Sequence, residues 1–542
     1  MNTSVLETAP AAVEKRSQTR THPEELFAVI AGSFLVLLIH GYHPYSVDAS
    51  IYIAGIKRVI APSLYAADGA FITEHTRLSI FSFVLGKLIS LTHIPLEIFL
   101  LLTYLALTAV VLLLVRQLAL RIFADGSAHD AKLAGWGAML LTVVCFPMPV
   151  AATSLLLLDP YVTARSLSTP LTLLAILAAI SKSGTKSWAN SWVWAAGCCI
   201  VAALFHPLMG LHLAVLLVVL FLTSQRRWRL LAALCVAAFL LCGVIYFGTA
   251  GVPVSASYRE AVTSRSYYFL SRWQWYEQFG LLAPLLLMAF AWKRNGTESL
   301  VGTLALTCLI VGSICCLCSL CFVHPGGPYL LMRLQFLRSF HTIYAIGVIL
   351  LGGSLAVHLP LFIQPRSTRI AQFAVLAVVA IGMYASERQT YKPAPHIELP
   401  DVIYAALPDM LASKVERDPW HQAFLWIRNN TPPAAVFAID PKFLDAQGES
   451  MPGFRALTER SILTDVKDEG LASLFPQLAP VWARNRDLES GIDSMSDVER
   501  SARMAPVGVN WILLSPQAKT ALNCPFANAA VRICDLSGGI HD

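Results

Sequence analysis

The sequence predicts a polytopic α-helical membrane domain followed by a small α/β domain, and three observations support this. Of the 542 residues, 56% are hydrophobic and 14% are charged, with a mean hydropathy of +0.60, whereas soluble domains carry about 25% charged residues. Apolar runs of about 20 residues, enough to cross a bilayer as a helix, recur along positions 1–385. From Glu387 onward the composition becomes that of an ordinary globular domain.

The N-terminal part carries basic residues ahead of the first apolar run, and no small-residue cleavage site follows. We therefore expect an uncleaved first span with its N-terminus in the cytoplasm. The predicted organisation is a cytoplasmic tail, a transmembrane domain that contains a long outer loop (42–77), a linker, and an extracytoplasmic α/β domain. In order, the four parts are residues 1–25, 26–386, 387–417 and 418–542.

About eleven spans are expected. They lie near 26–41, 78–93, 96–115, 133–148, 167–181, 192–222, 230–249, 278–292, 299–322, 337–363 and 369–386. Basic clusters at 225–229, 293–295 and 364–369 favour the cytoplasmic side and place the C-terminal part outside. An inside N-terminus agrees with this count only if 192–222 crosses once. A hairpin broken at His206-Pro207 would require a re-entrant segment elsewhere, and the sequence leaves both arrangements open.

The net charge of +6 comes from the membrane part, because residues from Glu387 onward include 20 acidic and 15 basic side chains. Positive charge beside spans indicates topology and contact with lipid head groups, and no nucleic-acid motif occurs. A Walker motif, Cys/His metal spacing and a Gly-x-Ser-x-Gly motif are also absent from the sequence. ATP-driven transport, a structural zinc site and a serine hydrolase are therefore unsupported.

The C-terminal part alternates helical segments with short apolar strands, which is typical of a small α/β domain. A helix is expected to begin at Asp418-Pro419, with the aspartate as its N-cap. Strands are expected near 435–439, 461–464, 511–514 and 530–533, and a second helix over 471–486. The charged residues around the second strand, Arg455, Arg460, Asp465 and Lys467, are interpreted as a structural network.

Two of the twelve cysteines, Cys524 and Cys534, lie in this polar C-terminal part, whereas the others lie in apolar runs. A disulfide between them would require an oxidising compartment. Two free thiols are the alternative, because spacing alone cannot distinguish the two states.

Ionisable side chains gather in the first outer loop. Asp48 follows the first predicted span, with His43, Tyr45, Glu74 and His75 in the same loop. A transferase that acts on a hydroxyl needs a carboxylate to take the proton or to hold a divalent ion. We assign Asp48 to that role and Glu74 or His75 to a second acid or ligand. The alternative is a solvated surface without chemistry.

Three further groups interrupt apolar runs, where ionisable residues are costly unless they face a cavity or each other. Arg165 with Asp159 could hold a phosphate or form a plain structural pair. His206 could contact a phosphate oxygen or simply mark a kink. Arg333, Arg338 and His341 suit a polyprenyl phosphate or diphosphate, or they reach to head groups. Arginines 259, 265 and 272 are interpreted as a weaker signal of the same kind in an interfacial belt.

Five motifs occur in a fixed order. They are His43-Pro-Tyr-x-x-Asp48, Arg165-Ser-Leu-Ser-Thr-Pro170, His206-Pro-Leu-Met209, Arg333-Leu-Gln-x-x-Arg338-Ser-Phe-His341, and Trp420-x-x-Ala-x-x-Trp-Ile-Arg428-x-Asn-Thr-Pro432. This order resembles a family of bacterial polytopic membrane proteins without an assigned activity. The wider architecture is similar to the GT-C superfamily of glycosyltransferases, in which Asp48 matches the position of the first-loop carboxylate. The chain has no second acidic motif of the Asp-x-Asp type.

The resemblance implies an inner-membrane protein that transfers a sugar from a polyprenyl phosphate to an extracytoplasmic acceptor. A divalent cation is the one cofactor that it leaves open. Two other functions stay open at this point. One is a transporter or flippase for a lipid-linked or anionic solute, which predicts inverted repeats, and the other is a non-catalytic scaffold with an outer binding domain.

Overall fold

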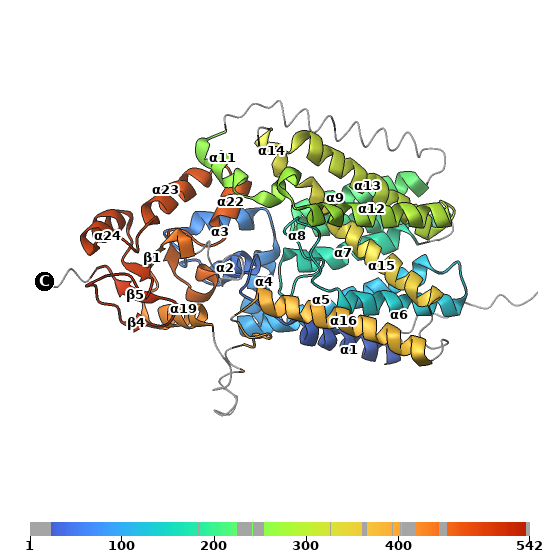
Figure 1. Ribbon diagram of the computed structural model, residues 1–542, viewed down its shortest axis with the longest axis horizontal. Helices are drawn as coiled ribbons and strands as arrows, with labels where there is room; N and C mark the ends of the chain where they lie inside the picture. The colour runs from blue at the N-terminus through green and yellow to red at the C-terminus, as the bar shows by residue number, and fades with distance from the viewer. Residues whose placement is uncertain are drawn as a thin grey trace, which may run out of the picture.

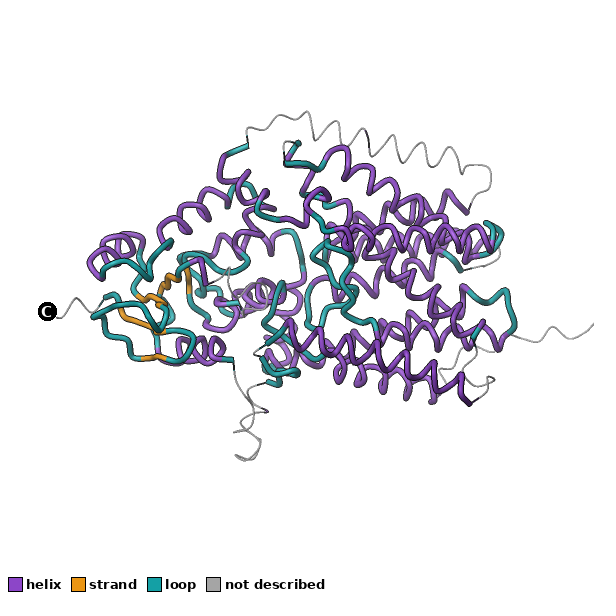
Figure 2. Tube along the Cα trace, viewed as in Figure 1, coloured by secondary structure: helices purple, strands orange, loops and turns teal. Residues whose placement is uncertain are grey.

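A computed structural model describes residues 23–181, 185–224, 241, 254–325, 327–359, 366–392, 394–400, 403, 418–443 and 453–537. A bundle of long helices lies beside a domain that contains the sheet, and the short helices α2, α3 and α4 lie between them (Figures 1 and 2). These short helices are Ala49–Ile60, Gly69–Arg77 and Phe81–Thr92.

The long helices of the bundle correspond to most of the apolar runs. They are α1 (Pro23–His40), α5 (Leu96–Ile122), α6 (Ala128–Val144), α7 (Ala164–Ala179), α8 (Thr185–Phe205), α9 (Pro207–Ser224), α12 (Trp275–Asn295), α13 (Leu300–Phe322), α15 (Phe340–His358) and α16 (Arg366–Thr390). Five stretches within the described residues are long and apolar enough to cross a membrane: α1, α5, α9, α13, and Phe336–His358, which contains α15. This arrangement is compatible with a membrane protein. The predicted span 230–249 lies outside the described residues, apart from residue 241.

The predicted span 78–93 is too short to cross by itself. Its helix, α4, has 12 residues, which extend about 18 Å against roughly 30 Å of hydrocarbon. After α4 the chain begins α5 at the same end of the bundle as the first loop. A hydrogen bond that Tyr45 of this loop donates to Glu97 at the start of α5 (2.7 Å) shows that the two are adjacent. Residues 42–92 therefore form one continuous layer of short helices at that end.

The segment 192–222 is a hairpin of α8 and α9, which decides between the two arrangements that the sequence left open. The rings of Trp192 and Phe221, at the open end of the hairpin, lie 5.2 Å apart. Near its closed end the Cys199 thiol donates to the carbonyl of Gly210 (3.5 Å). The segment therefore forms two helices where the sequence pattern gave one apolar run.

Charged contacts place several helix ends together, far from the C-terminal domain. Arg116 of α5 pairs with Glu25 at the start of α1 (2.9 Å). Arg294 at the end of α12 contacts His358 at the end of α15 (3.5 Å). The basic side chains near 116–132 and 293–295 lie at the bundle end where α1 begins (Figure 1).

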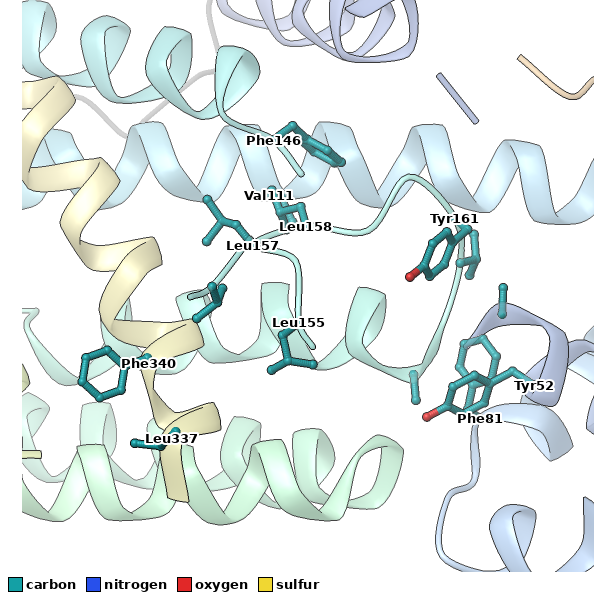
Figure 3. Packing of buried hydrophobic residues seen from close by; sticks show 14 of the residues in the cluster. Tyr52, Phe81, Val111, Phe146, Leu155, Leu157, Leu158, Tyr161, Leu337 and Phe340 are labelled. Carbon is teal, nitrogen blue, oxygen red and sulfur yellow. The ribbon is translucent and has the colours of Figure 1, made fainter. Parts of the chain in front are cut away.

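The chain between α6 and α7 is irregular yet buried inside the bundle. Leu155, Leu157 and Leu158 pack among the helices, with Phe146 and Val111 beside them (Figure 3). Irregular backbone at this depth is tolerated only when protein surrounds it. This loop leads into α7, whose start is capped by a hydrogen bond from the Thr163 N–H to the Ser166 hydroxyl (3.0 Å).

Further short helices lie at the bundle end near the C-terminal domain. They are α11 (Ala256–Thr263), η1 (Ser266–Tyr268), η2 (Leu270–Arg272), α14 (Tyr329–Met332) and η3 (Phe336–Ser339). Between α14 and η3, Gln335 has a left-handed backbone (φ 46°). Such a conformation is unusual for a residue other than glycine, and it separates two helical turns that the sequence alone would join.

The C-terminal domain is an α/β fold around a five-stranded sheet of order β2-β1-β3-β5-β4. Its strands are β1 (Val436–Ile439), β2 (Ser461–Ile462), β3 (Trp511–Leu514), β4 (Phe526–Ala527) and β5 (Arg532–Asp535). The first three are parallel, whereas β5 runs antiparallel to β3 and β4 runs antiparallel to β5. Four of these strands agree with predicted ones, whereas the sequence pattern did not reveal β4.

The helices of this domain are α19 (Pro419–Asn430), α21 (Phe454–Thr458), α22 (Asp468–Leu474), α23 (Ala479–Glu489) and α24 (Asp497–Met504), followed by η5 (Ala505–Val507). The predicted N-cap is confirmed, because the Asp418 carboxylate accepts from the Trp420 N–H (3.0 Å). The helix expected over 471–486 is broken into α22 and α23. Cys524 and Cys534 are joined by a disulfide.

The C-terminal domain contacts the rest of the protein on two sides. On one side the buried Arg455 binds Asp68 of the first loop, and Lys57 binds Glu459 (2.8 Å). On the other side Arg265 binds Glu469 (2.9 Å). We call these contacts the two-sided clamp. Arg455 and Asp465 therefore belong to a structural network, as expected.

Candidate functional site

A cavity of about 500 Å³ lies where the bundle, the short helices and the C-terminal domain meet. Its size is that of ordinary small-molecule sites. Separate parts of the chain line it: α2 and α3, the start of α7, the α8–α9 turn, η1 and the stretch before it, the α14–η3 turn, and α22. Six of the predicted site residues face it: Asp48, His75, Arg165, His206, Arg333 and Arg338.

Arg165 is the centre of the charged part of this cavity. Its guanidinium donates to Asp48 Oδ2 (2.8 Å) and, through two nitrogens, to both oxygens of Asp159 (3.1 and 3.2 Å). Thr163 also donates to Asp159 (3.1 Å). The structural pair of Asp159 with Arg165 is therefore present. It uses two of the three guanidinium nitrogens, and the third donates to Asp48 in the cavity.

The two carboxylates on Arg165 differ in environment. The Asp48 side chain is 30% exposed and the Asp159 side chain is 3% exposed. Burial raises the pKa of Asp159 despite its arginine partner. Burial also acts to raise the pKa of Asp48, but the charges of Arg165 and then Lys467 hold it well below its usual range. Asp48 is thus an ionised carboxylate that faces the cavity, and Asp159 supports Arg165 from behind.

Two histidines lie next to this carboxylate. His75 packs edge-on against the Tyr52 ring, with centroids 4.7 Å apart. Burial lowers the pKa of His75 to about 4, although the charge of Asp48 opposes the shift, so the imidazole is neutral near pH 7. His206 Nδ1 accepts from the Met209 N–H (3.4 Å) and thereby caps α9. The kink expected at His206-Pro207 is a full break between two helices, and it leaves His206 in the cavity wall.

Arg333 and Arg338 face the cavity together because of the turn at Gln335. A continuous helix would separate them by more than one turn and direct them to different sides. Arg338 lies over the ring of Tyr267 (5.6 Å), and its Nε is buried without a hydrogen-bond partner among the described residues. A buried guanidinium nitrogen without a partner is unusual. It is available to an anion in the cavity.

Five predicted site residues lie outside this cavity, and one of them is Asp159, which binds Arg165 from behind. His43 binds Glu398 (2.9 Å) and stacks on Tyr391, and Tyr45 binds Glu97. Glu74 pairs with Arg77 (3.0 Å) and accepts from Gln477 (2.8 Å). These three residues fasten the first loop to its neighbours.

His341 is the fifth of these residues, and it is buried in α15. Its Nε2 lies 2.9 Å from the Leu157 carbonyl. The sequence predicted that it shares a helical face with Arg338. In the structure Arg338 lies in η3 and lines the cavity, whereas His341 lies near the start of α15 and does not line it.

Two cations of the cavity had been given other roles from the sequence. Arg265 was assigned to an interfacial belt and Lys467 to the structural network of the C-terminal domain, yet both line the cavity. Lys467 lies 3.8 Å from Asp48 Oδ1. The five cations Arg165, Arg265, Arg333, Arg338 and Lys467 greatly outnumber the single lining carboxylate, so the cavity suits an anion.

The described residues contain no group of three or more His, Cys, Asp and Glu side chains placed to hold a metal ion. Neither a model of a known protein family nor the sequence of a curated protein matches this chain. Chemical inference therefore depends on the cavity itself. An anion can bind its arginines while Asp48 accepts a hydrogen bond from a neighbouring hydroxyl.

Proposed function

We propose that the protein is a GT-C-like membrane glycosyltransferase, which takes a sugar from a polyprenyl-phosphate donor and transfers it to an extracytoplasmic acceptor. The chain would be a multi-pass protein of the bacterial inner membrane, with its N-terminus in the cytoplasm and its C-terminal domain outside. One observation carries the proposal. Eight charged or histidine side chains from separate segments line one cavity at the end of an apolar bundle, where the phosphate of a membrane lipid would lie.

The proposed reaction follows from the charges in this cavity. The acceptor hydroxyl attacks the anomeric carbon of the donor and gives its proton to Asp48. The bond between that carbon and the phosphate oxygen breaks, and the phosphate leaves with the electron pair. Arg165, Arg333 and Arg338 stabilise the charge that develops on the leaving phosphate. Preplaced cations of this kind are often the largest catalytic term.

The test measures release of polyprenyl phosphate from polyprenyl-phosphate-linked hexoses by the purified, detergent-solubilised protein with its membrane extract as acceptor. We expect Asp48→Asn to lower the rate at least about 100-fold, because the variant lacks the proton acceptor. Asp487→Asn is the matched control, since that side chain is 72% exposed and does not line the cavity. Equal rates for Asp48→Asn and wild type would remove Asp48 from the mechanism.

A further inference from the structure

The C-terminal domain forms one wall of the cavity. Lys467, Gly470, Leu471, Leu474 and Phe475 all line it. Lys467 is the only charged residue in this wall, and it is 8% exposed. A lysine is seldom buried to this degree without a specific reason.

The ammonium group of Lys467 lies near Asp48, and the carboxylates next to Lys467 in sequence bind another cation. The two nearest carboxylates in sequence, Asp465 and Asp468, are both bound by Arg455 (3.7 and 2.6 Å). The Asp465 N–H also donates to Asp468 (2.9 Å), and the Lys467 carbonyl accepts from the Leu471 N–H (3.0 Å). The backbone of Lys467 is therefore fixed, and its side chain extends across the cavity to Asp48 of the first loop.

The contact of Lys467 with Asp48 is looser than that of Arg165. The Nζ–Oδ1 distance is 3.8 Å, whereas a charge-assisted hydrogen bond is about 2.7–2.9 Å long. Arg165 reaches that range at 2.8 Å and is held from behind by Asp159. A lysine ammonium is also a flexible point charge with three donors. Of the two cations on Asp48, Lys467 makes the longer contact, so moving it toward an incoming phosphate costs less than moving Arg165.

We propose that Lys467 is a phosphate ligand, which leaves Asp48 for the phosphate when an anionic lipid enters the cavity. Asp48 then keeps Arg165 as its cationic partner and becomes a better proton acceptor. This inference rests on the proposed function and makes the C-terminal domain part of the binding site. The ligand is a phosphate ester, and its lipid and free forms are distinguished below.

Binding is measured by isothermal titration of the detergent-solubilised full chain with geranylgeranyl phosphate, with geranylgeraniol and inorganic phosphate as separate probes. We expect Lys467→Met to weaken geranylgeranyl phosphate binding at least about tenfold, because a charged hydrogen bond is lost. Lys467→Arg retains the charge and should stay within about threefold of wild type. Lys442→Met is the matched control, since Lys442 is a lysine of the same domain with a 55% exposed side chain.

Equal binding by Lys467→Met and wild type would overturn this inference alone. Failure of wild type to bind geranylgeranyl phosphate saturably would overturn the proposed function as well. If inorganic phosphate binds as tightly as geranylgeranyl phosphate, the ligand is a free anion and not a lipid phosphate. Should Lys467→Met unfold, Lys467→Gln carries the same expectations without charge.

A second readout separates a role at Asp48 from a general loss of charge. The charged and titratable groups that interact with Asp48 are Arg165, Arg338, Lys467, Asp159, His75, His206, Tyr52 and Tyr161. Removing Lys467 takes away one group that lowers the pKa of Asp48. The acid limb of kcat/KM, which reports the free enzyme, should therefore move to higher pH in Lys467→Met. An unchanged limb would show that Lys467 does not act on Asp48.

Discussion

Arg165 binds two carboxylates at once, Asp48 and Asp159. Asp159 sits behind it in the buried loop after α6, and Asp48 sits in front of it in the cavity. Without Arg165, Asp159 would be an ionisable group with a 3% exposed side chain and only Thr163 as a side-chain partner in the described residues. The same residue that the proposed reaction uses therefore also stabilises the fold.

Arg165→Met should lower the free energy of unfolding by about 3–5 kcal/mol, because it leaves a buried charge without its partner. The measurement is unfolding of the detergent-solubilised protein. Arg77→Met is the control, since the Arg77 side chain is 65% exposed and exposed ion pairs contribute about 0–1 kcal/mol. Similar losses in the two variants would contradict the structural role of Arg165.

His75 gives a pH dependence of stability. Its pKa is lowered to about 4 in the folded protein by burial and is about 6.5 in an unfolded chain. The unfolded state therefore binds the proton first, and this contribution to stability is present above pH 6.5 and is lost as the pH falls toward 4. Wild type should lose more thermal stability between pH 7.5 and 5.5 than His75→Asn. Parallel curves would contradict the burial of this imidazole.

The sequence predicted which residues were unusual more reliably than where they point. Asp48, Arg165 and Arg338 were identifiable because charge beside apolar runs is costly. Lys467 lies among other charged residues of a soluble-type segment, where a lysine is ordinary. Its position opposite Asp48, more than 400 residues away, arises from tertiary packing that no local pattern records.

The hairpin of α8 and α9 shows how closely two helices approach at a glycine. A methyl group added at Gly210 would overlap the backbone of Ala203, whereas nothing lies within 4 Å of the equivalent position at Gly197. Close approach of this kind is typical of small residues between apolar helices. The sequence left the hairpin open because a His-Pro pair can mark either a kink or a break.

Gly210→Val should destabilise the protein by about 1–3 kcal/mol, since overpacking forces the two helices apart. Gly197→Val is the matched control on α8 and should change stability by less than about 0.5 kcal/mol, as surface substitutions usually do. Thermal unfolding in detergent measures both. Equal tolerance of the two substitutions would mean that α8 and α9 do not form this hairpin.

Elements were predictable where local chemistry is specific. The N-cap Asp418 and strands β1 and β3 follow from residue types within a few positions. The helix α4 was mistaken for a span because hydropathy counts apolar residues near 78–93 and does not register where the helix stops. His93, with a left-handed backbone, ends it after 12 residues.

The complete molecule has two chemically different ends. Basic residues near 116–132 and 293–295 lie at the end where α1 begins, and the cavity lies at the other. Basic loops favour the cytoplasm, so the cavity and the C-terminal domain should face outward. The Cys524–Cys534 disulfide agrees with an oxidising compartment.

Single-cysteine variants in a background without free thiols test this orientation. Gly508→Cys, in the C-terminal domain, should react with a membrane-impermeant maleimide added to cells in which only the outer membrane has been permeabilised. Gly296→Cys, in the α12–α13 turn, should react only after the inner membrane is permeabilised. Nothing lies within 4 Å of an added side chain at either glycine, but the positive φ values (65° at Gly296 and 86° at Gly508) strain any other residue, so the folding of each variant is verified before labelling. The reverse labelling pattern would contradict the proposed orientation.

The two-sided clamp has a consequence for biosynthesis. Lys57 and Asp68 meet their partners Glu459 and Arg455 only after about 400 further residues have been made. Until then the cavity lacks one wall, and Lys57 and Asp68 have not met these partners. The cavity is therefore completed last during synthesis, because the C-terminal domain supplies one of its walls.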